Sequence, residues 1–213
     1  MNIDLDYTAK DIKVVDGLSH VRARPKMYAG SVDSKGVFNL LKEVLNNSID
    51  EAVSGHCTEI KIELHDDDSI SIRDNGRGIP IERHSKLDMS ILEVIFTKIG
   101  ACGCGCEKPA GHRQDVNGMG LAPINALSEF LHVETTREDL VGWLSTYRAS
   151  FAKGSIASSL VEVAPTFSRG TKITFKPDSE IFDDTFLDAN IVEAHIDKLQ
   201  ETLKIPLSIE LEY

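Results

Sequence analysis

The stretch Glu43-Val44-Leu45-Asn46-Asn47-Ser48-Ile49-Asp50-Glu51-Ala52 is the part of the chain that decides the fold. It lies in a helix predicted over about residues 37–54, which ends at Gly55, a residue favoured just past a helix end. Residues four apart share a helix face. The spacing therefore predicts a polar stripe of Glu43, Asn47, Asp50 and Glu51 opposite an apolar row of Phe38, Leu41, Leu45, Ile49 and Ala52. A carboxylate and a carboxamide on the free face of such a helix suit a hydrated magnesium ion and an attacking water.

A glycine-rich turn, Asp74-Asn75-Gly76-Arg77-Gly78, follows this helix after a hairpin predicted over residues 59–64 and 69–73. Asp74 ends the second strand, where a buried carboxylate can accept a hydrogen bond from an exocyclic amine such as that of adenine. The two glycines allow close backbone approach to a ligand. An ordinary Asp-Asn-Gly turn would also explain the segment. Taken with the preceding helix, the turn indicates ATP.

Two further segments fit a nucleotide site. Asn117-Gly118-Met119-Gly120 leads into a helix predicted over residues 121–128, and the free N–H groups at a helix start favour phosphate. Thr171 begins a predicted strand and can hydrogen-bond a base, although a strand threonine standing alone needs no such role.

Residues 100–120 form a predicted glycine-rich loop. Its Cys102, Cys104 and Cys106 are too closely spaced for a typical structural zinc site, so we predict a lid there rather than a metal centre.

The remaining pattern predicts helices mixed with antiparallel strands. Strands are predicted over residues 131–136, 143–151, 159–164, 171–176 and 207–211, and helices over 17–24, 90–99 and 188–203. The expected fold is an α+β two-layer sandwich, a mixed and mostly antiparallel sheet with helices on one face. Residues 1–16 are expected to be an N-terminal arm. Residues 17–213 are expected to be one domain of a longer protein.

Composition excludes several classes of protein. The formal net charge of −11 and the lack of a Lys/Arg stripe argue against direct binding of DNA by these residues. No apolar run is long enough to span a bilayer, and the first residues lack the pattern of a secretion signal. Four cysteines in 213 residues do not form a disulfide framework. A cytoplasmic protein with no membrane contact is expected.

Together these segments resemble the four sequence boxes of the GHKL ATPases, the superfamily of gyrase, Hsp90, the histidine kinases and MutL. The matching residues are Glu43-x-x-x-Asn47-Ser48-Ile49-Asp50-Glu51-Ala52, Asp74-Asn75-Gly76-Arg77-Gly78-Ile79-Pro80, Asn117-Gly118-Met119-Gly120 and Gly170-Thr171. Arg24-Pro25-Lys26-Met27-Tyr28-Ala29-Gly30 and Asn125-Ala126-Leu127-Ser128 are similar to the ATPase subunit of bacterial type IIA topoisomerases, the gyrase B-subunit and topoisomerase IV ParE family.

The resemblance implies a role for each matching residue. Glu43 matches the general base of ATP hydrolysis and Asn47 the ligand of Mg²⁺. Asp74 matches the adenine-binding acid and Thr171 its support. The implied ATP-binding set is Tyr7, Asn47, Asp50, Asp74, Gly78, Asp115, Val116, Asn117, Gly118, Met119, Gly120, Leu121 and Thr171. The residues that match an aminocoumarin inhibitor pocket are Glu51, Arg77, Pro80 and Arg137, with Glu51 and Arg77 as an ion pair.

The resemblance also implies partners. It suggests a homodimer, formed through the arm and a domain beyond residue 213, with a gyrase A or ParC-type subunit and DNA bound by other domains. The alternatives are another GHKL branch, MutL-like or Hsp90-like, and a divergent module that binds nucleotide only to switch dimerisation. The second alternative arises because Gln114–Gly120 and Cys102–Glu107 depart from the usual phosphate-loop and lid sequences. The lid lysine therefore has no clear counterpart.

Overall fold

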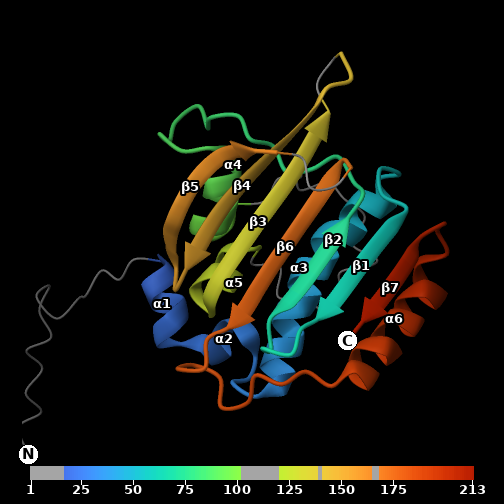
Figure 1. Cartoon of the computed structure of the whole chain (residues 1–213). Helices are drawn as coiled ribbons and strands as arrows, with labels where there is room; N and C mark the ends of the chain where they lie inside the picture. The colour runs from blue at the N-terminus through green and yellow to red at the C-terminus, as the bar shows by residue number, and fades with distance from the viewer. Residues whose placement is uncertain (1–16, 102–119, 139–140, 165–167) are drawn as a thin grey trace, which may run out of the picture.

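The computed structural model describes residues 17–101, 120–138, 141–164 and 168–213. Within them a single twisted sheet carries helices on one face, with α3, α4 and α5 behind the strands in the view of Figure 1. The predictions for Tyr7, for the cysteine cluster and for Asp115–Met119 lie outside the described residues. None of the described helices is long and apolar enough to cross a membrane.

The sheet has seven strands in the order β5-β4-β3-β6-β2-β1-β7. Every neighbouring pair is antiparallel except β1 and β7, which run parallel. This arrangement confirms the predicted α+β fold with a mixed, mostly antiparallel sheet. The strands are β1 (Glu59–Leu64), β2 (Ile70–Asp74), β3 (Ser128–Glu138), β4 (Leu144–Ala152), β5 (Ser155–Val163), β6 (Gly170–Pro177) and β7 (Ser208–Glu212).

Most helices differ from the predicted ranges only at their ends, but the helix over Pro25–Ala29 was not predicted. They are α1 (Gly17–Ala23), α2 (Pro25–Ala29), α3 (Ser34–Val53), α4 (Ile91–Thr97), α5 (Ala122–Ala126) and α6 (Ala189–Leu203). The helix expected over 121–128 is too long, because Ser128 already begins β3. Ser90 caps the start of α4, in a reciprocal capping box with Glu93.

Helix α3 forms the centre of the helical layer. Asp33 caps its start by accepting hydrogen bonds from the backbone N–H groups of Lys35 and Gly36. Its buried apolar residues pack toward the isoleucines of β1 and β2 in one continuous core. Helix α6 joins the same layer, where His195 meets Phe38 of α3 edge to face with ring centroids 5.3 Å apart. Each large apolar side chain that is fully buried in this core contributes about 1.5–3 kcal/mol to folding.

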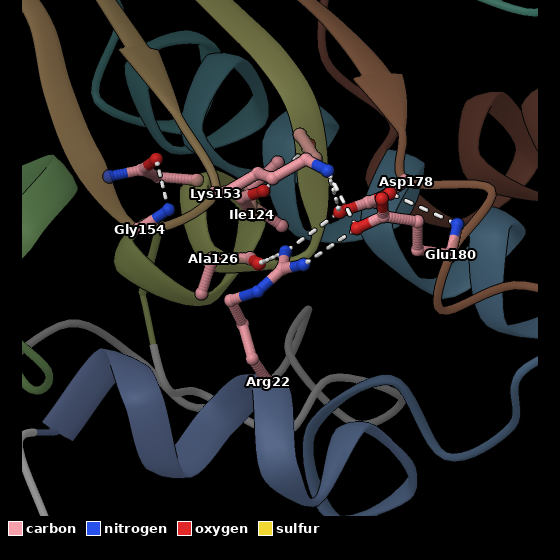
Figure 2. Close-up of polar contacts among 9 residues, drawn as sticks. Arg22, Ile124, Ala126, Lys153, Gly154, Asp178 and Glu180 are labelled. Atoms are coloured by element: carbon pink, nitrogen blue, oxygen red, sulfur yellow. Dashed lines mark hydrogen bonds and ion pairs between the residues drawn. The ribbon is translucent and has the colours of Figure 1, made fainter.

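Helix α5 is short, and neighbouring elements fix it through its polar groups. Asn125 donates from its amide to the Phe96 carbonyl at 2.9 Å and accepts from the Gly154 N–H at 3.0 Å. Arg22 of α1 donates to the Ala126 carbonyl at 2.8 Å (Figure 2). These contacts compensate for a helix too short to be stable alone.

The same arginine belongs to a group of charges that we call the Asp178 cluster: Arg22, Lys153, Asp178 and Glu180. Asp178 is 1% exposed, and its Oδ2 lies 2.8 Å from an Arg22 guanidinium nitrogen and 3.7 Å from the Lys153 ammonium (Figure 2). Burial alone would raise the pKa of Asp178, but the Glu180 N–H and the Arg22 guanidinium outweigh burial and hold that pKa below its ordinary value. The cluster joins α1, the β4–β5 turn and the end of β6.

Candidate functional site

Asp74 lies at the end of β2, directly opposite Thr171 of β6 in the strand register. It is only 2% exposed. Its Oδ1 accepts hydrogen bonds from the backbone N–H groups of Gly76 at 2.9 Å and Thr171 at 3.3 Å. Its Oδ2 accepts one from the Ser48 hydroxyl of α3 at 2.8 Å. The carboxylate is therefore held between the helix, the turn and the next strand.

The environment of Asp74 shifts its acidity. Burial raises the pKa of the Asp74 carboxyl above its ordinary value, and the hydrogen bonds from Gly76, Ser48 and Thr171 only partly offset this. All three of these donors are neutral. A buried carboxylate in such surroundings gains from a further hydrogen-bond donor brought by a ligand.

The turn after Asp74 has glycines where a side chain would not fit. A Cβ on Gly76 would lie 2.9 Å from Asp74 Oδ1 and 3.1 Å from Glu51. Gly170, across from the turn, has a φ of +143°, and a Cβ there would lie 1.9 Å from the Asp74 carbonyl oxygen. The missing side chains allow β6 and the turn to close around the aspartate.

Side chains from three elements hold the turn in place. Arg77 makes a two-pronged ion pair with Glu51 of α3, at 2.9 and 2.8 Å, and its backbone N–H adds a third contact at 3.2 Å. Arg137 of β3 donates to the Gly78 carbonyl at 2.7 Å. Arg169 donates from Nε to the Gly76 carbonyl at 3.1 Å. The result is a turn beside the buried acid that is fixed by contacts of three arginines.

The pKa of Glu51 reflects this arrangement. Burial alone would raise that pKa, but the hydrogen bonds and charge of Arg77 outweigh burial and lower it. Glu51 is therefore ionised at neutral pH, as the ion pair requires. Pro80, the fourth residue expected at an inhibitor pocket, is half-buried and follows the turn.

The polar stripe of α3 is only partly on a free face. Glu43, Asn47 and Glu51 are half-buried, but Asp50 is 5% exposed, so the expectation that it belongs to a free polar face is wrong. Helix α3 contacts α2, β2 and β6, and its buried residues include Asp50 beside Ile49.

Ser48 is a site residue that the sequence reasoning did not single out. Its position three residues after Leu45 and four before Ala52 places it within the apolar row, yet it is polar and buried. That mismatch is the signal that could have found it, because a buried hydroxyl needs a hydrogen-bond partner. Its partner is Asp74.

Of the expected phosphate-binding loop, residues 115–121, the structure describes only Gly120 and Leu121. Gly120 has a φ of +76°, and Leu121 is buried just before α5 begins. Within the described parts of the chain there is no group of three or more His, Cys, Asp or Glu residues that could hold a metal ion by itself.

Known proteins are similar to this chain in sequence. The family model described as histidine kinase-, DNA gyrase B-, and HSP90-like ATPase matches residues 32–181. The chain is 40% identical over 194 residues to the type 2 topoisomerase B-subunit of Aquifex aeolicus, and the match covers 91% of this chain and 24% of that protein. It is 42% identical over 184 residues to the DNA topoisomerase 4 B-subunit of Rickettsia bellii, covering 85% and 27%.

A solved structure agrees in fold and in sequence. The 43K ATPase domain of Thermus thermophilus gyrase B, crystallised in complex with an aminocoumarin, superposes with a TM-score of 0.76 at 34% identity. The match covers 92% of this chain and 48% of that one. The chain thus spans about a quarter to a third of the length of the curated relatives it matches.

Proposed function

The chain belongs to the histidine kinase-, DNA gyrase B- and HSP90-like ATPases, and on that premise we propose that it is the ATPase domain of a type IIA DNA topoisomerase. The observation that carries the proposal is the buried Asp74, fixed by Ser48, Gly76 and Thr171 beside a glycine turn. Such an acid can accept a hydrogen bond from the exocyclic amine of adenine. The similarity to the B-subunits of gyrase and topoisomerase IV supports the choice of enzyme class.

The proposed chemistry divides between the two ends of the pocket. At the adenine end, Asp74 binds the exocyclic amine, and Thr171 and Gly78 line the adenine ring. At the phosphate end, Glu43 of α3 takes the proton of the attacking water as general base. The proposed ATP-binding residues are those of the resemblance: Tyr7 from the partner's arm, Asn47, Asp50, Asp115, Val116, Asn117, Gly118, Met119, Gly120 and Leu121.

The residues on α3 fit a magnesium ion. Asn47 offers a neutral, hard amide oxygen one helical turn after Glu43, and Mg²⁺ commonly takes only one or two protein ligands beside phosphates and water. When bound, the ion neutralises charge on the terminal phosphates. Asn47 would hold the ion on the same face of α3 as Glu43. The general base and the metal-bound phosphates would then lie next to each other.

In the whole protein, ATP binding would close a dimer clamp and drive the passage of one DNA segment through another. The partners would be a second copy, a gyrase A or ParC-type subunit, and DNA. The net charge of −11 on these residues supports contact with DNA through other domains. A cytoplasmic location follows from such a role.

We also propose that an aminocoumarin binds at the mouth of this pocket. Glu51 pairs with Arg77 at 2.8 Å, Arg137 donates to the Gly78 carbonyl at 2.7 Å, and Pro80 follows the same turn. An inhibitor at this place would overlap the adenine site. The expected result is competition between an aminocoumarin and ATP in an equilibrium binding assay, and simultaneous binding of both would contradict the proposal.

The central experiment replaces the proposed base. Glu43→Gln keeps the shape of the side chain but cannot accept the proton, so Mg-ATP should bind within a few-fold of wild type while hydrolysis falls by about 100-fold or more. Calorimetry measures the first and phosphate release the second. Glu201→Gln, an exposed residue on α6, is the matched control and should change neither. An unchanged hydrolysis rate in Glu43→Gln would rule out Glu43 as the base.

A further inference from the structure

Arg169 directly precedes the first two residues of β6, Gly170 and Thr171, and reaches back to the glycine turn. Its Nε donates to the Gly76 carbonyl at 3.1 Å across 93 residues of sequence. One terminal nitrogen of the guanidinium also lies 3.9 Å from a Glu138 carboxylate oxygen. With 43% of its side chain exposed, Arg169 lies at the surface beside the turn and not in the core.

Gly76 is held at both of its backbone polar groups. Its N–H donates to Asp74 Oδ1 at 2.9 Å, and its carbonyl accepts from Arg169. Glycine has more backbone freedom than any other residue, so fixing it requires contacts of this kind. Without Arg169, the contact at the carbonyl side is lost and the N–H that orients Asp74 is less well fixed.

The second donor to the same carboxylate oxygen is also close to Arg169 in the chain. Thr171, whose N–H lies 3.3 Å from Asp74 Oδ1, is two residues after Arg169. One side chain therefore ties together the two backbone segments that orient Oδ1. Ser48 separately holds Oδ2.

We propose that Arg169 is a positioning residue for base recognition: it fixes the Gly76 peptide so that the Asp74 carboxylate keeps the orientation in which it accepts the adenine amine. This inference rests on the proposed function. It adds a residue that the family boxes do not include, and it predicts that Arg169 affects affinity for the base without touching the nucleotide.

The test compares two nucleotides on three variants. ATP carries the 6-amino group and purine riboside 5′-triphosphate lacks it, so only ATP uses the Asp74 contact. Arg169→Ala removes the hydrogen bond. Arg169→Gln restores it, because the Gln Nε2 is the same number of bonds from Cα as the Arg Nε. Arg148→Ala is the matched control, since Arg148 is 45% exposed and pairs with Glu134 on the sheet at 3.1 Å. Calorimetry on the full chain with Mg²⁺ gives each affinity.

We expect Arg169→Ala to weaken ATP binding about three- to tenfold and to change binding of the analogue less than about twofold. Arg169→Gln should return ATP affinity to within about twofold of wild type, and Arg148→Ala should alter neither nucleotide. Equal weakening of both nucleotides, unchanged ATP affinity in Arg169→Ala, or a Gln variant as weak as the Ala variant would each overturn the proposal. Equal affinity of the wild-type chain for the two nucleotides is a different failure. It would refute the proposed Asp74 contact itself, and the inference with it.

Discussion

Two buried aspartates lie near opposite ends of β6, Asp74 at the end of the neighbouring β2 and Asp178 just after β6, and they differ in their partners and in the direction of their pKa shifts. Asp74 is opposite Thr171 at the start of the strand, and Asp178 follows Pro177 at its end. Both are almost fully buried. Asp74 is surrounded by neutral donors, whereas Asp178 meets the cations Arg22 and Lys153 (Figure 2). Their pKa values consequently shift in opposite directions from the same ordinary value of 3.8, upward for Asp74 and downward for Asp178.

The contrast shows that burial of a carboxylate does not by itself indicate a functional site. The charge of Asp178 is already compensated within the protein, so that residue connects elements of the fold. Asp74 accepts hydrogen bonds from neutral donors only, and in the proposed function adenine would supply another donor. The partners of a buried acid, and not its depth, distinguish the two roles.

The largest effect on stability is expected for Asp178, just after the end of β6. Asp178→Ala leaves the Arg22 guanidinium without its buried counter-charge and should lower the free energy of unfolding by about 3 kcal/mol. Chemical denaturation measures this loss. Nucleotide affinity of the folded fraction should stay near wild type, because Asp178 is at the far end of β6 from Asp74. A stable Asp178→Ala protein that no longer binds ATP would contradict the structural role given to Asp178.

The opposite pattern is expected for Asp74→Asn. The amide keeps one acceptor oxygen but places an N–H₂ group where acceptors are needed, so ATP affinity should fall by about 1–3 kcal/mol. Stability should change little, since the substitution also removes a buried charge. Calorimetry with ATP and a denaturation curve on the same sample give the two numbers. A large loss of stability with intact ATP affinity would contradict the proposed role.

The two carboxyls should also give opposite dependences of stability on pH. The folded pKa of Asp178 lies below 3.8, so its contribution is present above that pH and is lost as the pH falls through the folded pKa. The folded pKa of Asp74 lies above 3.8, so its contribution is present below that pH and is lost as the pH rises through the folded pKa. Unfolding free energies of wild type, Asp74→Asn and Asp178→Asn between about pH 3 and pH 7 measure both slopes. Slopes of the same sign in the two comparisons would disprove the contrast.

The smallest effect is expected for the ion pair between Glu51 and Arg77. Arg77 is about half exposed, so the pair is screened by solvent, and Arg77→Ala should cost less than about 1 kcal/mol of stability. Thermal unfolding at low and high salt tests this value, with a smaller difference from wild type at high salt. A loss as large as that of Asp178→Ala would show that the turn is as important to folding as the Asp178 cluster.

Local patterns were sufficient to predict most of the fold. The period of α3 and the alternation of the strands follow from the sequence itself, so the elements and the fold class were predictable. The element ends were less so. Residues 121–128 look helical throughout, but pairing of Ser128 with Pro177 takes that residue into β3. Tertiary contact decides such a boundary, and the local sequence does not contain it.

The site was predictable where one segment carries the information. Asp74 and its glycines are adjacent in sequence, and Glu51 and Arg77 are matched by the resemblance. Arg169 and Ser48 were missed because each acts on a residue 26 or more positions away, Ser48 on Asp74 and Arg169 on Gly76. The ion pair between Arg22 and Asp178 joins residues still farther apart in the sequence, and no periodic pattern of residues predicts it.

The place of β6 in the sheet has a consequence for how the chain assembles. In order of synthesis, β1 and β2 form one antiparallel block and β3, β4 and β5 form another, and β6 is made after both yet lies between them (Figure 1). Until Gly170–Pro177 leaves the ribosome, the inner edges of β2 and β3 have no neighbouring strand to pair with. Such open edges slow folding and favour association with other chains. The strand that runs from a position beside Asp74 to one just before Asp178 is thus also the one that joins the two halves of the nascent domain.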